Sequence, residues 1–523
     1  MNHTTGRVAI ISKRLREKPQ DVEAVAGLRA CRSGAMRQAV SAVATAGEDS
    51  LSGRARAFAG AKNLALITLW PAPISLSALD RAGRPLGYVV DGVAPVPRPP
   101  EDRVLVDAAV ADLLALAPPG ELRLAADFDP DDPRLVWLDP YDRKRIPLAR
   151  ALEIAGDILR HRAKTARRSF VVGVTRWKRP AVRSFLDGPN GPPVFLHDPE
   201  KAASQARAGF GRVVTWASRD AAAAERAARR AGAPLARLED GFLRSVGLGA
   251  AFIEAVSLVL DDAGIYYDPS APSDLETLLR EAEIAPELAA RAAALRRRLV
   301  AENVTKYNVG RDAARVVPEG RVGVLVPGQV EDDASIIRGA GAVRTNRDLL
   351  ASVRRRRPDA FIVYKPHPDV VAGYRSGAVP PHDLALADAV VVEGSIAALY
   401  PQCSALETMT SLSGFEALLR GLSVTTHGAP FYAGWGLTED LAPHPRRGVA
   451  RTLDELVAAT LILYPLYRDP ASGLPCGPET ALESLLAGRA RASTWRGAAA
   501  ARLRHVYALA RHRMLGPIAR RLP

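Results

Sequence analysis

The sequence predicts an α/β protein with two Rossmann-like domains that face a cleft and an additional N-terminal region. Short apolar runs typical of buried strands alternate with helical stretches in two successive series, and a long helical segment at 284–303 separates the series. Strands that alternate with helices form a mainly parallel sheet with helices on both faces. Residues 1–165 lack this regular pattern, so they are expected to form a separate region of unknown role.

The first Rossmann-like domain is expected at 168–318. Its expected strands are buried apolar runs, and helical stretches lie between them. The strands are expected at 169–174, 193–196 and 213–216, and the helices at 199–208 and 219–232.

The second Rossmann-like domain is expected at 319–475. Ligands of such sheets bind outside the carboxyl ends of the strands, so residues that follow a strand are the first candidates for a site. The same alternation predicts strands at 321–326, 360–364 and 389–392, and helices at 345–356 and 413–420.

One acidic segment of the N-terminal region has two interpretations. Asp127-Phe-Asp129-Pro-Asp-Asp132 contains a D-x-D pattern, which can hold a metal-bound nucleotide. A calcium loop is excluded, because its sixth and twelfth positions would need Gly and Glu but are Asp132 and Leu138. The two prolines in and after the segment favour an acidic turn.

Composition indicates a folded chain in a reducing compartment. Apolar residues make up 48% of the sequence, and none of the three cysteines belongs to a C-x-x-C pair. A disulfide framework or a thiolate zinc site is therefore not expected. No secretory h-region is visible near the start, and no uncharged apolar run approaches the roughly 18–20 residues of a membrane span. We expect a cytoplasmic protein, soluble or peripheral to a membrane.

Residues 476–523 are expected to form a basic helical tail. From residue 484 onward there are nine arginines and no Asp or Glu, and the arginines alternate with apolar residues. The tail is expected either to attach to anionic lipid headgroups or to pack on the protein with a solvated arginine face, and both can hold. Nucleic-acid binding is not expected, because no helix-turn-helix, zinc-finger or RNP pattern occurs.

Acidic residues stand at two candidate positions. Glu239 and Asp240 precede a glycine-rich loop, where they suit acid–base chemistry or hydroxyl binding, although a helix cap explains them as well. Glu331, Asp332 and Asp333 follow a predicted strand, in an expected active-site loop or at a helix N-terminus that favours negative charge.

Phosphate-binding candidates follow two other segments. Lys365 and His367 lie in a turn stiffened by two prolines, which predicts a cationic pair suited to a leaving phosphate. Hydroxyl residues lead into the helix expected from residue 413, whose free N–H groups can bind phosphate. Glu416 is expected one turn further, within reach of ribose hydroxyls. The aromatic and glycine-rich loop 430–438 either covers a base or sugar or packs a turn.

Together, these strings resemble the KpsC/LipB-type capsule polysaccharide β-Kdo transferases. The resemblance spans about residues 168–468, and one set of motifs is present. The set looks like the carboxy-terminal transferase module, which the family associates with a β-(2→7) link. The matching strings are Glu239–Gly249, Ser257–Asp268, Lys306–Asn308, Val326–Ile336, Tyr364–Val370, Thr408–Gly421 and Pro430–Thr438.

The resemblance implies a glycosyltransferase-B fold and a retaining transfer of Kdo from CMP-Kdo, without a bound metal or another cofactor. The implied acceptor is a Kdo-terminated lipid on which capsule polysaccharide is assembled. Other capsule-assembly enzymes and the inner face of the inner membrane are the further expected partners.

The resemblance also implies roles for single residues. Asp333 is the expected nucleophile, with Asp332 as the near alternative, and Glu239 is the expected general base, with Asp240 as the alternative. Retaining glycosidases hold two such carboxyl groups about 5–5.5 Å apart, which is a loose guide here. The expected substrate-binding residues are Lys365, His367, Ser411, Ser413 and Gly414 for the phosphate, Glu416 for the ribose, Arg244 for the Kdo carboxylate, and Gln329.

Two other functions remain open at this point. A nucleotide-sugar epimerase of similar two-domain architecture would also place acids and a histidine in a cleft. A capsule-assembly scaffold could keep the fold without activity, but the full complement of Glu239, Asp333, Lys365 and His367 argues against it.

Overall fold

The computed structural model describes residues 65–91, 102–218, 221–245, 255–305 and 314–492, with short segments between 7 and 59. The chain divides into two compact units. The first unit comprises Met1–Ala166 with the short segments Gly188–Asn190 and Asp469–Gly477, and the second comprises the remaining residues. The first unit thus ends next to the predicted boundary at 165.

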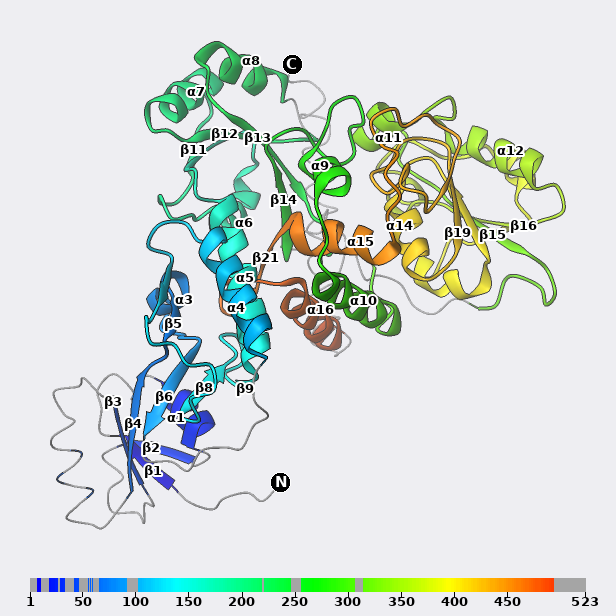
Figure 1. Ribbon diagram of the computed structural model, residues 1–523. Helices are drawn as coiled ribbons and strands as arrows, with labels where there is room; N and C mark the ends of the chain where they lie inside the picture. The colour runs from blue at the N-terminus through cyan, green and yellow to red at the C-terminus, as the bar shows by residue number, and fades with distance from the viewer. Residues whose placement is uncertain are drawn as a thin grey trace. The chain divides into compact units, whose positions relative to one another are not determined.

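The N-terminal unit has its own α/β fold, which the sequence did not reveal (Figure 1). Strands β2, β1, β3 and β4 are parallel, and β6, β8 and β9 continue the sheet in antiparallel fashion. Apolar residues of α4 and α5 pack with Trp137 of β8 in the main core of this unit. Its elements are β1 (Arg7–Ile10), α1 (Pro19–Ala26), β2 (Arg29–Arg32), β3 (Ala42–Ala46), β4 (Ala65–Pro71), β5 (Ile74–Leu76), α3 (Ser77–Arg81), β6 (Gly87–Asp91), α4 (Arg103–Leu116), β7 (Leu122–Leu124), β8 (Leu135–Leu138), β9 (Arg145–Ile146), α5 (Leu148–Lys164) and β22 (Pro475–Cys476).

The acidic segment of this unit is a turn, as predicted. Asp129 accepts a hydrogen bond from the backbone of Asp131 at 3.1 Å, and both carboxylates pair with Arg103. Asp132 pairs with Arg134 at 2.8 Å. Arg103 therefore holds the carboxylate of Asp129, one of the two in the D-x-D pattern.

The first Rossmann-like domain has the sheet order β11-β10-β12-β13-β14-β21. Strands β11, β10, β12 and β13 are parallel, and β14 runs antiparallel to β13. Alternate residues of the parallel strands face opposite sides, where α7 and α8 cover one face and α6 the other. Its elements are β10 (Ser169–Val172), η2 (Arg176–Lys178), α6 (Arg179–Phe185), β11 (Val194–Phe195), α7 (Pro199–Ala208), β12 (Arg212–Trp216), α8 (Ala222–Ala231), β13 (Leu235–Asp240), β14 (Ser257–Asp261), α9 (Asp274–Glu281) and α10 (Pro286–Ala301).

The second Rossmann-like domain has an all-parallel sheet in the order β17-β16-β15-β18-β19-β20. Apolar residues of α12 pack on β15 and β16 to form its core. Its elements are β15 (Gly323–Pro327), α11 (Ala334–Gly339), α12 (Asn346–Arg356), β16 (Phe361–Lys365), α13 (Pro368–Val371), η4 (Asp383–Leu386), β17 (Ala389–Val390), η5 (Ile396–Ala398), η6 (Tyr400–Gln402), β18 (Ala405–Thr408), α14 (Leu412–Leu419), β19 (Ser423–Thr426) and β20 (Glu439–Asp440).

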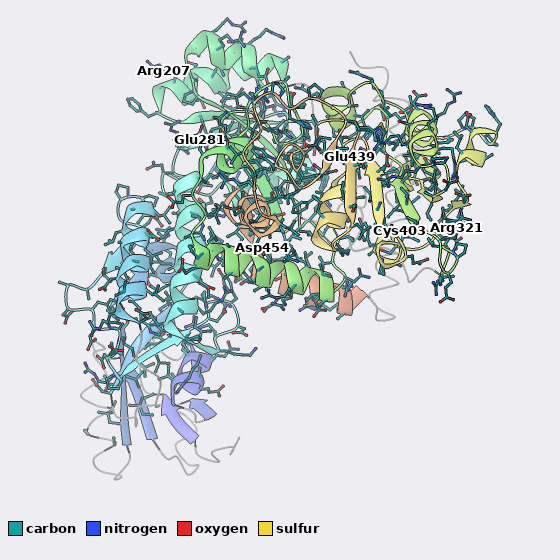
Figure 2. The ribbon with its side chains drawn as sticks, turned by 45° about the vertical axis from the view of Figure 1, so that its right-hand side comes forward. Arg207, Glu281, Arg321, Cys403, Glu439 and Asp454 are labelled. Atoms are coloured by element: carbon teal, nitrogen blue, oxygen red, sulfur yellow. The ribbon has the colours of Figure 1, made fainter. Side chains whose placement is uncertain are left out.

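The chain returns from the second domain to the first near its end. Asp454 of α15 (Leu453–Val457), which is labelled in Figure 2, pairs with Arg296 of α10 at 2.8 Å. The π-helix η7 (Ala458–Leu463) follows, and β21 (Pro465–Arg468) pairs antiparallel with β14. The predicted second domain, 319–475, included β21, but this strand belongs to the sheet of the first domain. The sequence pattern does not show which strands pair over long distances.

The predicted elements of both Rossmann-like domains are confirmed, with ends that differ by at most three residues. The first part of the basic tail forms α16 (Pro478–Ala492), which packs on α10 through an ion pair of 2.7 Å between Glu479 and Arg291. Residues 493–523, which carry most of the tail's arginines, lie outside the described residues.

Candidate active site

A cavity of about 440 Å³ is lined by both Rossmann-like domains. Its walls come from the carboxyl ends of β13, β15 and β16 and from the loop after β18, as expected for sheets of this kind. The predicted site residues that line it are Glu239, Asp240, Gln329, Asp333, Lys365, His367, Ser411, Ser413 and Glu416. Asp332, Arg244 and Gly414 are outside this lining.

Glu239 and Asp240 are the last two residues of β13. The buried Glu239 carboxylate accepts hydrogen bonds from the backbone N–H groups of Ser218 at 3.1 Å and Asp240 at 3.0 Å. Burial, followed by the charge of Asp240, raises the pKa of Glu239 despite these bonds. A carboxyl group with a raised pKa is suited to exchange protons with a substrate hydroxyl.

Arg244 forms an ion pair with Asp240. Its Nε atom lies 2.9 Å from Oδ2 of Asp240, and Nη1 donates to the hydroxyl of Ser245. The amino group of Lys178 lies 3.8 Å from the same Asp240 oxygen. Asp240 thus has two cationic neighbours, whereas Glu239 is held by backbone donors. The glycine-rich loop after Ser245, at 246–254, lies outside the described residues, as does the Lys306–Asn308 motif.

Asp333 lies both at a helix N-terminus and at the cavity, the two positions that the sequence left open. It caps the N-terminus of α11, where Oδ1 accepts bonds from the backbone N–H of Ser335 at 3.0 Å and from its hydroxyl at 2.8 Å. Its side chain also lines the cavity. Asp332, by contrast, is 57% exposed and pairs with Arg375 at 3.1 Å. Of the two neighbours, Asp333 is the one placed to reach a ligand in the cavity.

Lys365 and His367 line the cavity where β16 ends. The Lys365 amino group donates to the carbonyl of Val392 at 2.6 Å, and burial lowers the pKa of Lys365. The Nδ1 atom of His367 accepts from the backbone N–H of Asp369 at 3.1 Å, which leaves the ring proton on Nε2. Burial lowers the pKa of His367. Burial thus disfavours a positive charge on both Lys365 and His367, and the cationic pair stays a prediction.

The N-terminus of α14 forms another wall of the cavity. Ser411 caps this helix by accepting a bond from the backbone N–H of Ser413 at 3.1 Å. Gly414 is covered by Tyr432, because a Cβ atom at this position would lie 2.2 Å from the Tyr432 hydroxyl oxygen. That hydroxyl donates to the carbonyl of Ser411 at 2.6 Å. Gly414 therefore allows Tyr432 to support the Ser411 turn.

Gln329 and Glu416 are both held by hydrogen bonds at the cavity wall. The Gln329 side-chain oxygen accepts from the backbone N–H of Thr410 and from the hydroxyl of Thr408, each at 3.0 Å. Gln329 thereby connects the loop after β15 to the loop after β18. Glu416 accepts a 2.9 Å bond from the hydroxyl of Tyr400. Gln329 orders the wall as well as lining it.

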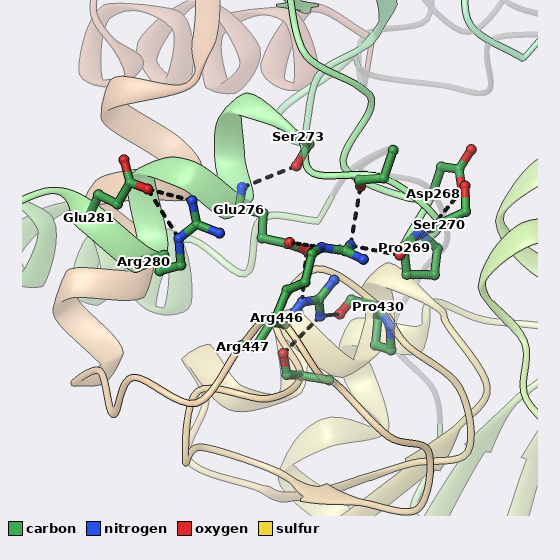
Figure 3. Close-up of polar contacts among 12 residues, drawn as sticks. Asp268, Pro269, Ser270, Ser273, Glu276, Arg280, Glu281, Pro430, Arg446 and Arg447 are labelled. Atoms are coloured by element: carbon green, nitrogen blue, oxygen red, sulfur yellow. Dashed lines mark hydrogen bonds and ion pairs between the residues drawn. The ribbon is translucent and has the colours of Figure 1, made fainter.

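An arginine pair fastens the aromatic loop to the first Rossmann-like domain (Figure 3). Arg446 and Arg447 both reach the buried carboxylate of Glu276 on α9, with Nε–O distances of 2.6 and 3.2 Å. Arg447 also donates to the carbonyls of Pro430 and Ala433. Pro430 lines the cavity. The contacts of Arg446 and Arg447 with Glu276 and with the loop carbonyls, called the Glu276 clasp below, therefore connect α9 to the cavity wall.

The sequence reasoning missed several residues of this region. Nothing near Glu276, Arg446 or Arg447 indicated their contact, since they are far apart along the chain. Tyr266 and Tyr267 also line the cavity, and they lie inside a motif string that the resemblance included. Their position in that string was the available signal.

Two properties hold for the described part of the chain. No three His, Cys, Asp or Glu side chains gather there in an arrangement that could hold a metal ion. None of the helices in the described ranges has the length and apolar character needed to cross a membrane.

Comparison with known proteins shows related sequences. A model of the family described as "Capsule polysaccharide biosynthesis protein" matches residues 211–295 and 286–467. The capsule polysaccharide modification protein LipA of Neisseria meningitidis serogroup A is 39% identical over 351 residues, which are 67% of this chain and 50% of LipA. The lipopolysaccharide-processing protein LpsZ of Rhizobium meliloti is 44% identical over 277 residues, 52% of this chain and 63% of LpsZ. The chain thus spans about half the length of LipA.

Two solved structures resemble this chain over nearly their whole length. The β-Kdo 2,7 transferase of Thermosulfurimonas dismutans KpsC is 34% identical, with a TM-score of 0.50, and the match covers 62% of this chain and 99% of that one. The β-Kdo 2,4 transferase of the same KpsC is 32% identical, with a TM-score of 0.54, and the match covers 61% and 98%. The two modules are similar to this chain to nearly the same degree.

Proposed function

Because this chain belongs to the family of capsule polysaccharide biosynthesis proteins, we propose that it is a retaining β-Kdo transferase that uses CMP-Kdo. Its acceptor is a Kdo-terminated glycolipid, and the link formed is β-(2→7). The observation that carries the proposal is the cavity, where Glu239 from one domain and Asp333 from the other line one space with Lys365. The likeness to the KpsC transferases supports the same activity.

The donor phosphate would lie against Lys365, His367 and the N-terminus of α14. Lys365 supplies a positive charge, and His367 supplies an Nε2–H donor. The positive end of the α14 helix dipole also favours an anion at this wall. These groups stabilise the charge that gathers on the CMP phosphate as it leaves, so the reaction proceeds without a metal ion. Glu416 lies one turn further, in reach of the ribose.

The transfer would take two displacements. A carboxylate oxygen of Asp333 attacks the anomeric carbon, and the bond from that carbon to the CMP phosphate breaks with its electron pair on CMP. Both hydrogen bonds that the Asp333 carboxylate accepts from described residues end on Oδ1, so Oδ2 is the attacking oxygen. An acceptor hydroxyl then displaces Asp333 while Glu239 takes its proton. The two inversions leave the β configuration unchanged.

The deciding experiment combines the purified protein with CMP-Kdo and a short Kdo-terminated acceptor. We expect the acceptor to gain one β-linked Kdo, read by mass and linkage analysis, with equal rates with and without EDTA. Release of free sugar or an epimerised sugar would contradict transfer in favour of an epimerase-like enzyme, and no turnover would favour a scaffold. A β-(2→4) product would overturn the linkage, and loss of activity with EDTA that magnesium restores would overturn the metal-free step.

A further inference from the structure

Arg375 is a cationic residue of the cavity that the sequence analysis did not single out. It lines the cavity, and its side chain is 39% exposed. Its Nε atom donates to Oδ1 of Asp332 at 3.1 Å. Among the residues that the structure describes, its two Nη groups have no hydrogen-bond partner. The outer end of the guanidinium is therefore left for a ligand, and its planar fork matches the geometry of a carboxylate.

The backbone around Arg375 is held between two walls of the cavity. The backbone N–H of Arg375 donates to the carbonyl of Asp369 on α13 at 3.3 Å, and Asp369 itself lines the cavity. The backbone N–H of Glu331, in the loop after β15, donates to the carbonyl of Ser376 at 3.2 Å. The segment that carries Arg375 is thus tied to the chain that follows β15 and to the chain that follows β16.

Two observations place the guanidinium group beside the residues proposed for the transfer. Its partner Asp332 is the residue before Asp333, which lines the same cavity. Burial chiefly, and the charge of Arg375 to a smaller extent, lower the pKa of His367, so the guanidinium lies close enough to this ring to act on it. Arg375 therefore lies on the side of the cavity where Asp333 would attack.

The proposed donor sugar carries a negative charge at its reacting carbon. Kdo is an α-keto acid, so its carboxylate is attached to the anomeric carbon that Asp333 would attack. These two carboxylates repel each other unless a cation lies close to both. The leaving phosphate lies on the opposite side of that carbon from the attacking oxygen. A cation next to Asp333 is therefore suited to the sugar carboxylate rather than to the phosphate.

We propose that Arg375 binds the carboxylate of the donor Kdo through its two Nη groups, while its Nε atom stays on Asp332. Neutral sugars lack this carboxylate, so the same contact selects an acidic sugar. The inference rests on the proposed function, because it needs CMP-Kdo in the cavity. It gives Arg375 the contact that the resemblance implied for Arg244, which is buried against Asp240 and lies outside the cavity lining.

The test is Arg375→Gln, which removes the charge and the fork. We expect kcat/KM for CMP-Kdo to fall by about 10–100-fold through a higher KM, the usual effect of losing hydrogen bonds to a charged substrate group. Binding of CMP in calorimetry and the KM for the acceptor should stay unchanged, because neither involves the donor carboxylate. Arg375→Lys keeps a point charge without the fork, so its loss should be intermediate.

Arg347→Gln is the matched control. The Nε atom of Arg347 also donates to an aspartate, Asp383, at 2.9 Å, and its side chain is 58% exposed. Arg347 is not part of the cavity lining. This variant loses the same charge and the same kind of surface ion pair, so its KM for CMP-Kdo should stay at the wild-type value. The two variants together separate a contact with the sugar from a general loss of positive charge.

The outcomes are distinct when the wild type transfers Kdo. An unchanged KM for CMP-Kdo in Arg375→Gln would show that the inference is wrong. Equal weakening of CMP and CMP-Kdo would also overturn it, because Arg375 would then contact the nucleotide. A higher KM for the acceptor alone would assign Arg375 to the acceptor's carboxylate and reject the contact with the donor.

If the wild type transfers nothing, the proposed function fails, and calorimetry with CMP-Kdo and with CMP still decides on Arg375. Weaker binding of CMP-Kdo by Arg375→Gln, with equal binding of CMP, would support the inference. Equal binding of CMP-Kdo by wild type and variant would reject it, as would a wild type that does not bind CMP-Kdo.

Discussion

The Nε atom of Arg244 lies 2.9 Å from Oδ2 of Asp240, and the arginine side chain is only 2% exposed. Arg244 thus neutralises a carboxylate at the end of β13 from beneath the cavity wall. From this pair we predict that Arg244 supports the site through Asp240, whereas the sequence had predicted a contact with a sugar carboxylate.

We expect Arg244→Met to destabilise the protein by up to about 3 kcal/mol, because the largely buried Asp240 carboxylate then keeps only Lys178, at 3.8 Å, as a cationic neighbour. The midpoint of urea unfolding measures this loss. A variant with native stability and a raised KM for CMP-Kdo would contradict the structural role and restore the contact between Arg244 and the sugar.

Asp333 and Asp332 should differ sharply when each is changed to Asn. Asp333→Asn keeps an oxygen that can cap α11 but cannot act as a nucleophile, so transfer should fall at least about 1,000-fold while CMP still binds. Asp332→Asn loses a solvent-exposed ion pair, so its rate should stay within about threefold of wild type. Steady-state rates and CMP calorimetry measure both. The reverse order of activities would make Asp332 the nucleophile.

The rate should fall on the acid side as Glu239 takes up a proton. A general base acts in its deprotonated form, and burial together with Asp240 raises the pKa of Glu239 above its ordinary value of 4.5. The acid limb of kcat/KM against pH should therefore lie above pH 4.5. Asp240→Asn removes the raising charge and should move this limb to lower pH, whereas Glu239→Gln should lower the rate by about 100-fold or more and abolish the limb. An acid limb that Asp240→Asn leaves in place would count against this assignment.

The clasp at Glu276 should contribute both stability and acid sensitivity. Burial alone would raise the pKa of Glu276, but Arg446 and Arg447 outweigh it and hold the pKa below the ordinary value of 4.5. The stabilisation is therefore present above about pH 4.5 and is lost as the pH falls through the lowered pKa. Glu276→Gln should cost about 3 kcal/mol at pH 7 and less at acid pH.

Glu281→Gln is the control for this prediction. Glu281 is 58% exposed and pairs with Arg280 on the surface of the same helix (Figure 3). Surface pairs contribute about 0–1 kcal/mol, so the effect of this variant should be small at both pH values. Chemical unfolding at pH 7 and pH 4 measures the two variants. Equal losses for Glu276→Gln and Glu281→Gln would show that the clasp does not stabilise the protein.

Deletions in the basic tail should separate packing from membrane attachment. Removing 489–523 cuts into α16, where Arg489 donates to the carbonyl of Glu302 at 2.9 Å, so it should lower stability. Removing 505–523 should spare transfer to a soluble acceptor but weaken binding to anionic vesicles at low salt, because each Lys or Arg near such a surface contributes about 1 kcal/mol. Vesicle sedimentation measures this binding. Unchanged binding without 505–523 would contradict attachment through this segment.

The sequence by itself determined the α/β class, the two Rossmann-like domains and nine of the 28 residues that line the cavity. Parallel strands buried on both faces leave continuous apolar runs, which is why the strands near 169, 213 and 323 could be recognised. The residues that follow such strands converge at one edge of the sheet, so Lys365 and Asp333 could be proposed for one site before their positions were known.

Only the tertiary structure decided which of these residues face the cavity and what holds them there. Asp332 and Asp333 are neighbours of the same chemical type, and the direction of each side chain depends on the helix cap at Ser335 and the ion pair with Arg375. The sequence pattern also did not predict the fold of the described residues of 1–165 or the pairing of β21 with β14 in the first sheet. The clasp between Glu276 and Arg447 joins residues far apart in sequence. Local composition records propensity and periodicity, whereas these contacts depend on chain segments that meet only after folding.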